Sequence, residues 1–299
     1  MKLPGKNELR ALVRLTRYKE YLAFVVVTSL LGAAAGNGVF GLKLLAVLLA
    51  NWLAVGFSFM INDVEDARDD ALNPKKAMRN PVSAGMMSEK DGTKAAFAVA
   101  LMAGAIYLTL GFAAALTGWI CLGTGFLYSW KKIRLKSIPV LDILSHGFML
   151  AGLQFLAAVY AFSPERVSGW WTLLIFVSAI SMYGQMFNEV RDYECDLKAG
   201  VTHTASVIGK RAATLVMGIF LAGGVLAGGH AILIRRFFPM WVMGLMGLIV
   251  VLFLIRPVWK MRKEMNIVEL QQPMQKPIEW AAALSLGTWF VWPWLVKFF

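Results

Sequence analysis

The stretch Asn62-Asp63-Val64-Glu65-Asp66-Ala67-Arg68-Asp69-Asp70 follows immediately on an apolar run that reaches Ile61. Ionised carboxylates are costly beside hydrocarbon and are retained there mainly for function. The i, i+3, i+7 spacing of Asp63, Asp66 and Asp70 places all three on one helical face. Three like charges repel each other unless a cation lies among them, and hard oxygen ligands favour magnesium. The stretch therefore predicts a magnesium site at the end of a membrane helix.

A second acidic motif repeats this pattern later in the chain. It reads Asn188-Glu189-Val190-Arg191-Asp192-Tyr193-Glu194-Cys195-Asp196 and again follows an apolar run. Two matching acidic faces at the ends of two apolar segments indicate one shared site, in which metal ions bind a diphosphate between them. The predicted metal ligands are Asp63, Asp66, Asp70, Glu189, Asp192 and Asp196.

The composition is that of a membrane protein. Of 299 residues, 58% are hydrophobic and 16% are charged, which is too apolar for an ordinary soluble domain. A helix needs about 20 apolar residues to cross the hydrocarbon core. The sequence predicts one all-α domain over residues 1–299, an integral membrane bundle of nine transmembrane helices around a central cavity. The predicted spans are Tyr21–Ala35, Leu44–Ile61, Ala95–Leu116, Trp119–Tyr128, Val140–Phe162, Trp171–Phe187, Leu215–Leu233, Met240–Ile255 and Trp280–Leu295.

The distribution of basic residues predicts the orientation of this bundle. Cytoplasmic loops carry the excess of Lys and Arg, and all but five of the 30 such residues fall on one side of the nine-span topology. That side holds the amino terminus, with a predicted interfacial amphipathic helix over residues 1–20, and the predicted motif loops 62–94 and 188–212. Merging the third and fourth spans would destroy the asymmetry. We therefore expect an integral protein of a prokaryotic inner membrane, with an active site that faces the cytoplasm.

The net charge of +12 suits anionic lipid head groups and an anionic substrate. Nucleic acid is the competing partner for a basic chain, but the basic residues are spread over short loops and the sequence contains no nucleic-acid-binding module. Cys121 and Cys195 lie in apolar or acidic surroundings and are too few for a disulfide framework or a zinc site. We therefore expect membrane lipid and an anionic amphiphile as partners, and no nucleic acid.

Basic residues near the motifs are candidates for binding phosphate. Lys75 and Arg79 follow the first motif, and the planar guanidinium of Arg79 suits phosphate oxygens. Lys131 and Lys132 follow the fourth predicted span and could close on the same group from another side. Each lysine could equally reflect positive-inside topology or a membrane anchor.

Two other polar residues have simpler interpretations. Asp142 begins the fifth predicted span, where a carboxylate complements the positive end of the helix dipole. His203 lies in the loop after the second motif. Its side chain could face the site, but exposure to solvent is the default expectation.

Two acidic clusters, nearby cations and an apolar bundle fit an amphiphilic substrate with a diphosphate head and a hydrocarbon tail. Neutralising the departing diphosphate would drive cleavage of an allylic C–O bond. An acceptor nucleophile would then capture the allylic cation while apolar walls exclude water. The competing hypothesis is a transporter that binds a cation in transit, which would place acidic groups near the bilayer midplane.

At these residues the sequence resembles the UbiA superfamily of intramembrane prenyltransferases. Asn62-Asp63-x-x-Asp66-x-x-x-Asp70 is similar to the first motif of that family, and Glu189-x-x-Asp192-x-x-x-Asp196 is similar to the second. The resemblance implies a Mg²⁺-dependent enzyme that transfers a prenyl group from a prenyl diphosphate to an aromatic or lipid acceptor.

The resemblance also implies roles for individual residues. The aspartates of both motifs would hold magnesium, Arg79 and Lys132 would contact diphosphate, and Tyr128 would lie near the reacting end of the substrate. The catalytic residues that we predict are Asp66, Tyr128 and Asp192, and the substrate-binding residues are Asn62, Lys75, Arg79, Lys131, Lys132 and Asn188.

Two departures from the family pattern lie where acceptor choice could be set. The segment Asn73–Pro81 is shifted and longer than the Asn-x-Pro-x-Arg-Pro loop of the family, and Glu189 stands where Asp is usual. The Asn-Pro-Lys-Lys variant resembles branches that act on carotenoids or other isoprenoid lipids, which gives an alternative acceptor class.

Overall fold

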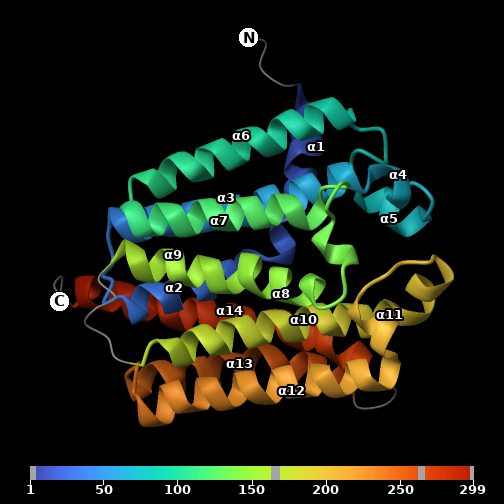
Figure 1. Cartoon of the computed structure of the whole chain (residues 1–299). Helices are drawn as coiled ribbons and strands as arrows, with labels where there is room; N and C mark the ends of the chain where they lie inside the picture. Colours follow the sequence, from blue (N-terminus) through green and yellow to red (C-terminus); the bar gives the residue numbers. More distant parts are fainter. Residues whose placement is uncertain (1–4, 163–168, 262–266, 297–299) are drawn as a thin grey trace.

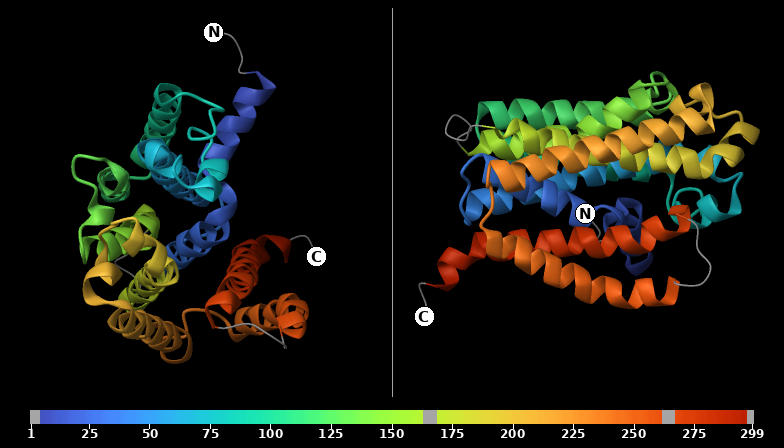
Figure 2. Two further views of the ribbon diagram at one scale, coloured as in Figure 1. Left: turned by 90° about the vertical axis from the view of Figure 1, so that its right-hand side faces the viewer. Right: turned by 90° about the horizontal axis from the view of Figure 1, so that it is seen from below.

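The computed structural model describes residues 5–162, 169–261 and 267–296, and within these ranges the regular elements are all helical. The long helices run along a common direction, and short helices gather at one end (Figure 1). Viewed from that end, the helices follow an open ring (Figure 2). They are α1 (Lys6–Thr16), α2 (Leu22–Ala35), α3 (Leu42–Glu65), α4 (Ala67–Asp70), α5 (Pro74–Arg79), α6 (Glu89–Leu108), α7 (Phe112–Ser129), α8 (Leu141–Gly147), α9 (Leu153–Ala161), α10 (Trp171–Lys198), α11 (Thr204–Ile208), α12 (Lys210–Gly229), α13 (Met240–Met261) and α14 (Ile267–Leu295).

The all-helical membrane-type prediction is confirmed at the level of helix length and apolarity. Among the described residues, six helices are long and apolar enough to cross a membrane, and a seventh results if α1 and α2, bent by 59°, form one span. The apolar part of α13, Met240–Leu254, is shorter. The count of nine spans, the orientation and the central cavity stay predictions.

The third and fourth predicted spans are separate helices, but the break between them lies elsewhere. α6 ends at Leu108 and α7 begins at Phe112, whereas we predicted a third span to Leu116 and a fourth from Trp119. Gly111 between the two helices has a φ of +106°, which only glycine adopts at little cost. The predicted boundary was wrong because the apolar run continues across this glycine, so hydrophobicity alone does not locate the break.

The two segments predicted as motif loops are largely helical. α10 continues through the second motif to Lys198, and the first motif is divided between the end of α3 and the short helix α4. Charged side chains on one face of a helix leave its backbone hydrogen bonds intact, so the helices extend beyond their apolar runs.

α2 and α9 pack at backbone contact because of two glycines. A Cβ on Gly32 would lie 2.4 Å from the backbone oxygen of Phe155, and a Cβ on Gly36 would lie 2.7 Å from that of Val159. Small residues one helical turn apart allow this close approach in membrane proteins.

A buried amide joins four helices of the bundle. Asn51 Nδ2 donates to Ser29 Oγ at 2.8 Å and to the backbone oxygen of Gln154 at 3.1 Å. The hydroxyl of Tyr107 donates to Asn51 Oδ1 at 2.7 Å. These bonds join α2, α3, α6 and α9, so the helix that carries the first motif has a fixed position.

The amino-terminal helix α1 packs against the bundle. Ala11 and Leu15 are fully buried, and Leu15 joins the apolar core formed by α3 and α6. The helix therefore lies against the end of the bundle that carries the first motif, while its predicted place at the membrane interface stays a prediction.

Candidate active site

Both acidic motifs lie at the same end of the bundle. The first motif ends α3 and forms α4, the second motif occupies the carboxyl end of α10, and these segments gather at the right of Figure 1. Tyr128, near the end of α7, interacts electrostatically with Asp66 of the first motif and with Glu189 of the second. The phenol is therefore within electrostatic reach of a carboxylate from each motif.

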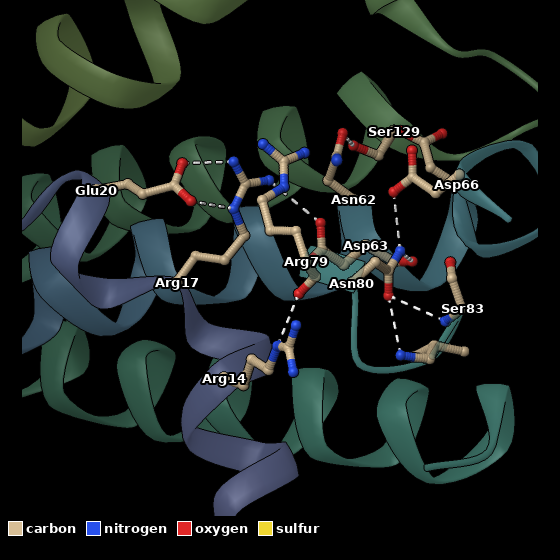
Figure 3. A network of polar contacts seen from close by, with 12 residues as sticks. Arg14, Arg17, Glu20, Asn62, Asp63, Asp66, Arg79, Asn80, Ser83 and Ser129 are labelled. Atoms are coloured by element: carbon tan, nitrogen blue, oxygen red, sulfur yellow. Dashed lines mark hydrogen bonds and ion pairs between the residues drawn. The ribbon is translucent and has the colours of Figure 1, made fainter. Parts of the chain in front are cut away.

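Asp63 is fully buried, and Arg17 Nη1 lies 3.2 Å from its Oδ1 (Figure 3). Arg17 also pairs with Glu20 and lies 4.7 Å above the ring of Phe59. Asp63 Oδ2 has no hydrogen-bond partner. Arg79 interacts electrostatically with Asp63, and Figure 3 shows its guanidinium beside that of Arg17. The structure thus places Arg79 near the first motif, together with an arginine that the sequence did not single out.

Asn80 connects the two ends of the first motif. It is fully buried, and its Nδ2 donates to the backbone oxygen of Asp63 at 2.7 Å and to Asp70 Oδ2 at 3.0 Å. Its Oδ1 accepts from the N–H of Val82 at 3.0 Å. Sequence reasoning missed this residue, and the only signal for it is an Asn directly before Pro81 in a turn-rich loop.

Asp66 is bound by the loop that follows α7. Arg134 Nη2 lies 3.2 Å from Asp66 Oδ1, and Lys136 Nζ donates to Asp66 Oδ2. Lys136 also donates to Asn62 Oδ1 at 2.9 Å, so Asn62 shares a cation with Asp66. Burial lowers the pKa of Lys136 below its ordinary value, although the ion pair with Asp66 acts in the opposite direction.

Other predicted substrate-binding residues lie further out. Lys131 and Lys132 are exposed, and Lys132 Nζ lies 5.5 Å from the centre of the Trp130 ring. Asn188 is exposed on α10. The side chain of Lys75 lies outside the described part of the structure. The two cations that do reach Asp66 were missed, because a run of basic residues does not reveal which of them face inward.

His203 connects two carboxylates of the second motif. Its Nδ1 lies 3.3 Å from Glu189 Oε2, and its Nε2 lies 3.3 Å from Asp196 Oδ2. Burial lowers the pKa of His203, but the interactions with the carboxylates of Asp196 and Glu189 outweigh burial and raise the pKa to about 9. The expectation of an exposed side chain was wrong, because α11 folds back against α10 and leaves His203 only 4% exposed.

The remaining acidic side chains of the second motif have different surroundings. Glu189 is buried and accepts from Gln185 Nε2 at 2.9 Å and from the N–H of Ala205 at 3.1 Å. Asp192 pairs with both guanidinium donors of Arg191 at 2.9 and 2.7 Å. Glu189 therefore anchors the segment after α10, whereas Asp192 remains near the surface.

Asp142 links α8 to α11. It is fully buried in the first turn of α8, where the helix-dipole interpretation places it. Its carboxylate accepts from both the N–H and the hydroxyl of Thr204 and from the N–H of Ile143 at 2.8 Å. These bonds give Asp142 an anchoring role beside the second motif.

The donor chemistry of the two motifs fits magnesium. Asp63 Oδ2 is a buried carboxylate oxygen without a partner, which is a costly arrangement that a cation relieves. Within the ranges that the structure describes, no group of three or more His, Cys, Asp or Glu side chains is arranged to hold a metal ion. The carboxylates pair instead with cations of the protein. The assignment of individual metal ligands therefore stays a prediction.

Comparison with known proteins identifies the family of the chain. Residues 22–271 match the UbiA prenyltransferase family. A lycopene elongase/hydratase from Haloarcula japonica is 32% identical over 215 residues, which cover 69% of this chain and 70% of that protein. A digeranylgeranylglyceryl phosphate synthase from Thermococcus gammatolerans is 28% identical over 225 residues, which cover 74% of this chain and 77% of that protein.

The fold is also similar to that of solved structures. A UbiA homolog from Archaeoglobus fulgidus bound to DMAPP and Mg²⁺ matches with a TM-score of 0.69 at 19% identity, covering 92% of this chain and 96% of that one. The sequence resemblance is thus confirmed over most of the chain. The chain belongs to the UbiA prenyltransferase family and is an enzyme of the UbiA prenyltransferase type.

Proposed function

We propose that the enzyme transfers a prenyl group from a prenyl diphosphate to a lipid acceptor within the membrane, in a Mg²⁺-dependent reaction. The observation that supports this proposal is that Tyr128 interacts electrostatically with both Asp66 of the first motif and Glu189 of the second. The proposed ligands of magnesium are Asp63, Asp66, Asp70, Asp192 and Asp196. Glu189, already bonded to three protein donors, positions the second motif.

The chemistry follows from charge. When bound, Mg²⁺ neutralises the charge that develops on the leaving diphosphate as the allylic C–O bond breaks and its electron pair moves to oxygen. Arg79 and the cations beside Asp66 bind the same diphosphate through charge-assisted hydrogen bonds. The electron-rich face of the Tyr128 ring stabilises the allylic cation. Electrons of the acceptor then form the new bond while apolar side chains exclude water, and the alkylated acceptor loses a proton, which the released diphosphate can accept.

The acceptor that we propose is an isoprenoid lipid, with carotenoids as the first candidates. Support comes from the relatives named lycopene elongase/hydratase and digeranylgeranylglyceryl phosphate synthase. Aromatic acceptors are the second candidate, because a 4-hydroxybenzoate octaprenyltransferase from Salmonella paratyphi B is 28% identical over 183 residues. Mass spectrometry of lipids from cells that express the protein with each acceptor distinguishes the two classes.

The enzyme reaction is tested with purified protein in nanodiscs. We expect release of pyrophosphate from a prenyl diphosphate only when Mg²⁺ and an acceptor are both present. Asp66→Asn and Asp192→Asn should lower the rate by roughly 10²-fold or more, as for loss of a group that stabilises developing charge. Full turnover by either variant would remove the basis of the proposal. Metal-driven ion flux without turnover would favour the transporter. That hypothesis places acidic groups near the bilayer midplane, whereas both acidic clusters lie at one end of the bundle.

A further inference from the structure

The loop after α7 binds the first acidic motif through two cations. Arg134 Nη2 lies 3.2 Å from Asp66 Oδ1 and 3.1 Å from Asp69 Oδ2. Lys136 Nζ donates to Asp66 Oδ2 and, at 2.9 Å, to Asn62 Oδ1. Both oxygens of Asp66 are therefore engaged by positive side chains.

The backbone of this loop directs the two cations inward. Arg134 has a φ of +49°, and its N–H donates to the backbone oxygen of Trp130 at 2.7 Å. The N–H of Ser137 then donates to the backbone oxygen of Arg134 at 2.8 Å. This turn leaves the side chain of Lys136 only 14% exposed, against 31% for Arg134. The turn therefore fixes the position of Lys136 beside Asp66. An exposed ion pair between flexible surface side chains has no such constraint.

A divalent ion on Asp66 would share that carboxylate with both cations. Like charges this close repel each other strongly in a partly buried site. An ion that arrives alone therefore has to displace Lys136 and Arg134 from Asp66, and Arg134 then keeps its pair with Asp69. A diphosphate that arrives with the ion offers the displaced cations new oxygen acceptors.

We propose that Lys136 and Arg134 are built-in counter-ions of Asp66, which oppose binding of the metal alone and move to the diphosphate when the two bind together. The exchange makes metal and diphosphate bind cooperatively, since each then lowers the cost of binding the other. This inference rests on the proposed function and adds an order of ligand binding. The metal–diphosphate complex binds in preference to free metal.

The full-length protein in detergent provides the test, with Mn²⁺ as a spectroscopic substitute for Mg²⁺ and inorganic pyrophosphate as the diphosphate. Free Mn²⁺ is measured by electron paramagnetic resonance with and without pyrophosphate. We expect Lys136→Gln to bind Mn²⁺ alone several-fold more tightly than wild type. The same variant should bind pyrophosphate, at saturating Mn²⁺, roughly tenfold more weakly.

Two further variants keep the test decisive. Lys94→Gln removes the same charge from an exposed site on α6, where Lys94 faces Asp91, and should leave both affinities unchanged. Arg134→Gln changes a more exposed partner of Asp66, so it reports on the same exchange if Lys136→Gln does not fold. Lys136→Arg retains the charge and should restore pyrophosphate binding.

The outcomes separate this inference from the proposed function. Opposite changes in the two affinities support the exchange of partners. An unchanged or weaker Mn²⁺ affinity in Lys136→Gln and Arg134→Gln overturns it, even if wild-type protein binds metal and turns over. Wild-type protein that binds neither Mn²⁺ nor pyrophosphate overturns both.

Discussion

His203 Nε2 lies 3.3 Å from Asp196 Oδ2, across the turn that joins α10 to α11. The other nitrogen of the ring lies at the same distance from Glu189. The second motif thus contains its own cation whenever the imidazole is protonated. The two carboxylates raise the pKa of this imidazole to about 9.

The titration of His203 is the first prediction. Nuclear magnetic resonance of histidine-labelled protein should show His203 titrating near pH 9, and Asp196→Asn should lower that pKa because it removes one of the two carboxylates. Since the pKa is raised in the folded protein, the interaction stabilises the fold fully below about pH 6.5 and is lost as the pH rises through about 9. A midpoint at or below 6.5 in wild-type protein would contradict the geometry.

Asn80 provides the second prediction. Asn80→Ala removes the donor that holds Asp70 and the backbone of Asp63 and leaves buried acceptors without a partner. We expect it to cost about 1–3 kcal/mol of unfolding free energy, measured by denaturation in detergent.

The effect of Asn80 on the site separates it from an ordinary core residue. Asn80→Ala should also weaken Mn²⁺ binding. Neither Asp63 nor Asp70 is changed, but their positions relative to each other are no longer fixed by Asn80. Loss of stability with unchanged metal affinity would show that Asn80 supports the loop alone and does not position the first motif.

The close contact of α2 with α9 gives the third prediction. Gly32→Ala places a methyl group 2.4 Å from the backbone oxygen of Phe155, so the helices must separate. We expect a loss of about 1–3 kcal/mol of unfolding free energy. The matched control is Gly218→Ala on α12, where the added carbon meets no atom of another helix within 4 Å. This control should be neutral or stabilising by up to about 1 kcal/mol, and an equal loss at both positions would exclude the packing explanation.

Helix periodicity explains why the acidic motifs could be found from the sequence. The 3 + 4 spacing of Asp63, Asp66 and Asp70 and its repetition in the second motif depend only on local helix geometry. The end of an apolar run locates the end of the bundle. These two properties were sufficient to predict the helical class and the sharing of one end by both motifs.

The partners of those carboxylates could not be predicted in the same way. Arg134 has a positive φ, and this turn directs Arg134 and Lys136 toward Asp66. The sequence shows four basic residues close together but not which of them face the site. Burial of His203 depends on how α11 returns to α10, which is a tertiary property. In both cases the deciding contact joins segments that are distant in the sequence or separated by an irregular turn.

The orientation in the membrane is the last prediction, and the two cysteines report on it without any engineering. Cys195 is exposed within the second motif, whereas Cys121 is buried and its Sγ donates to the backbone oxygen of Met149 at 3.1 Å. If the motifs face the cytoplasm, a membrane-impermeant maleimide should label the protein rapidly in inside-out vesicles and slowly in intact cells. Cys195→Ser should abolish the labelling, because the remaining thiol is inaccessible. Rapid labelling of Cys195 in intact cells would reverse the topology that the distribution of Lys and Arg predicts.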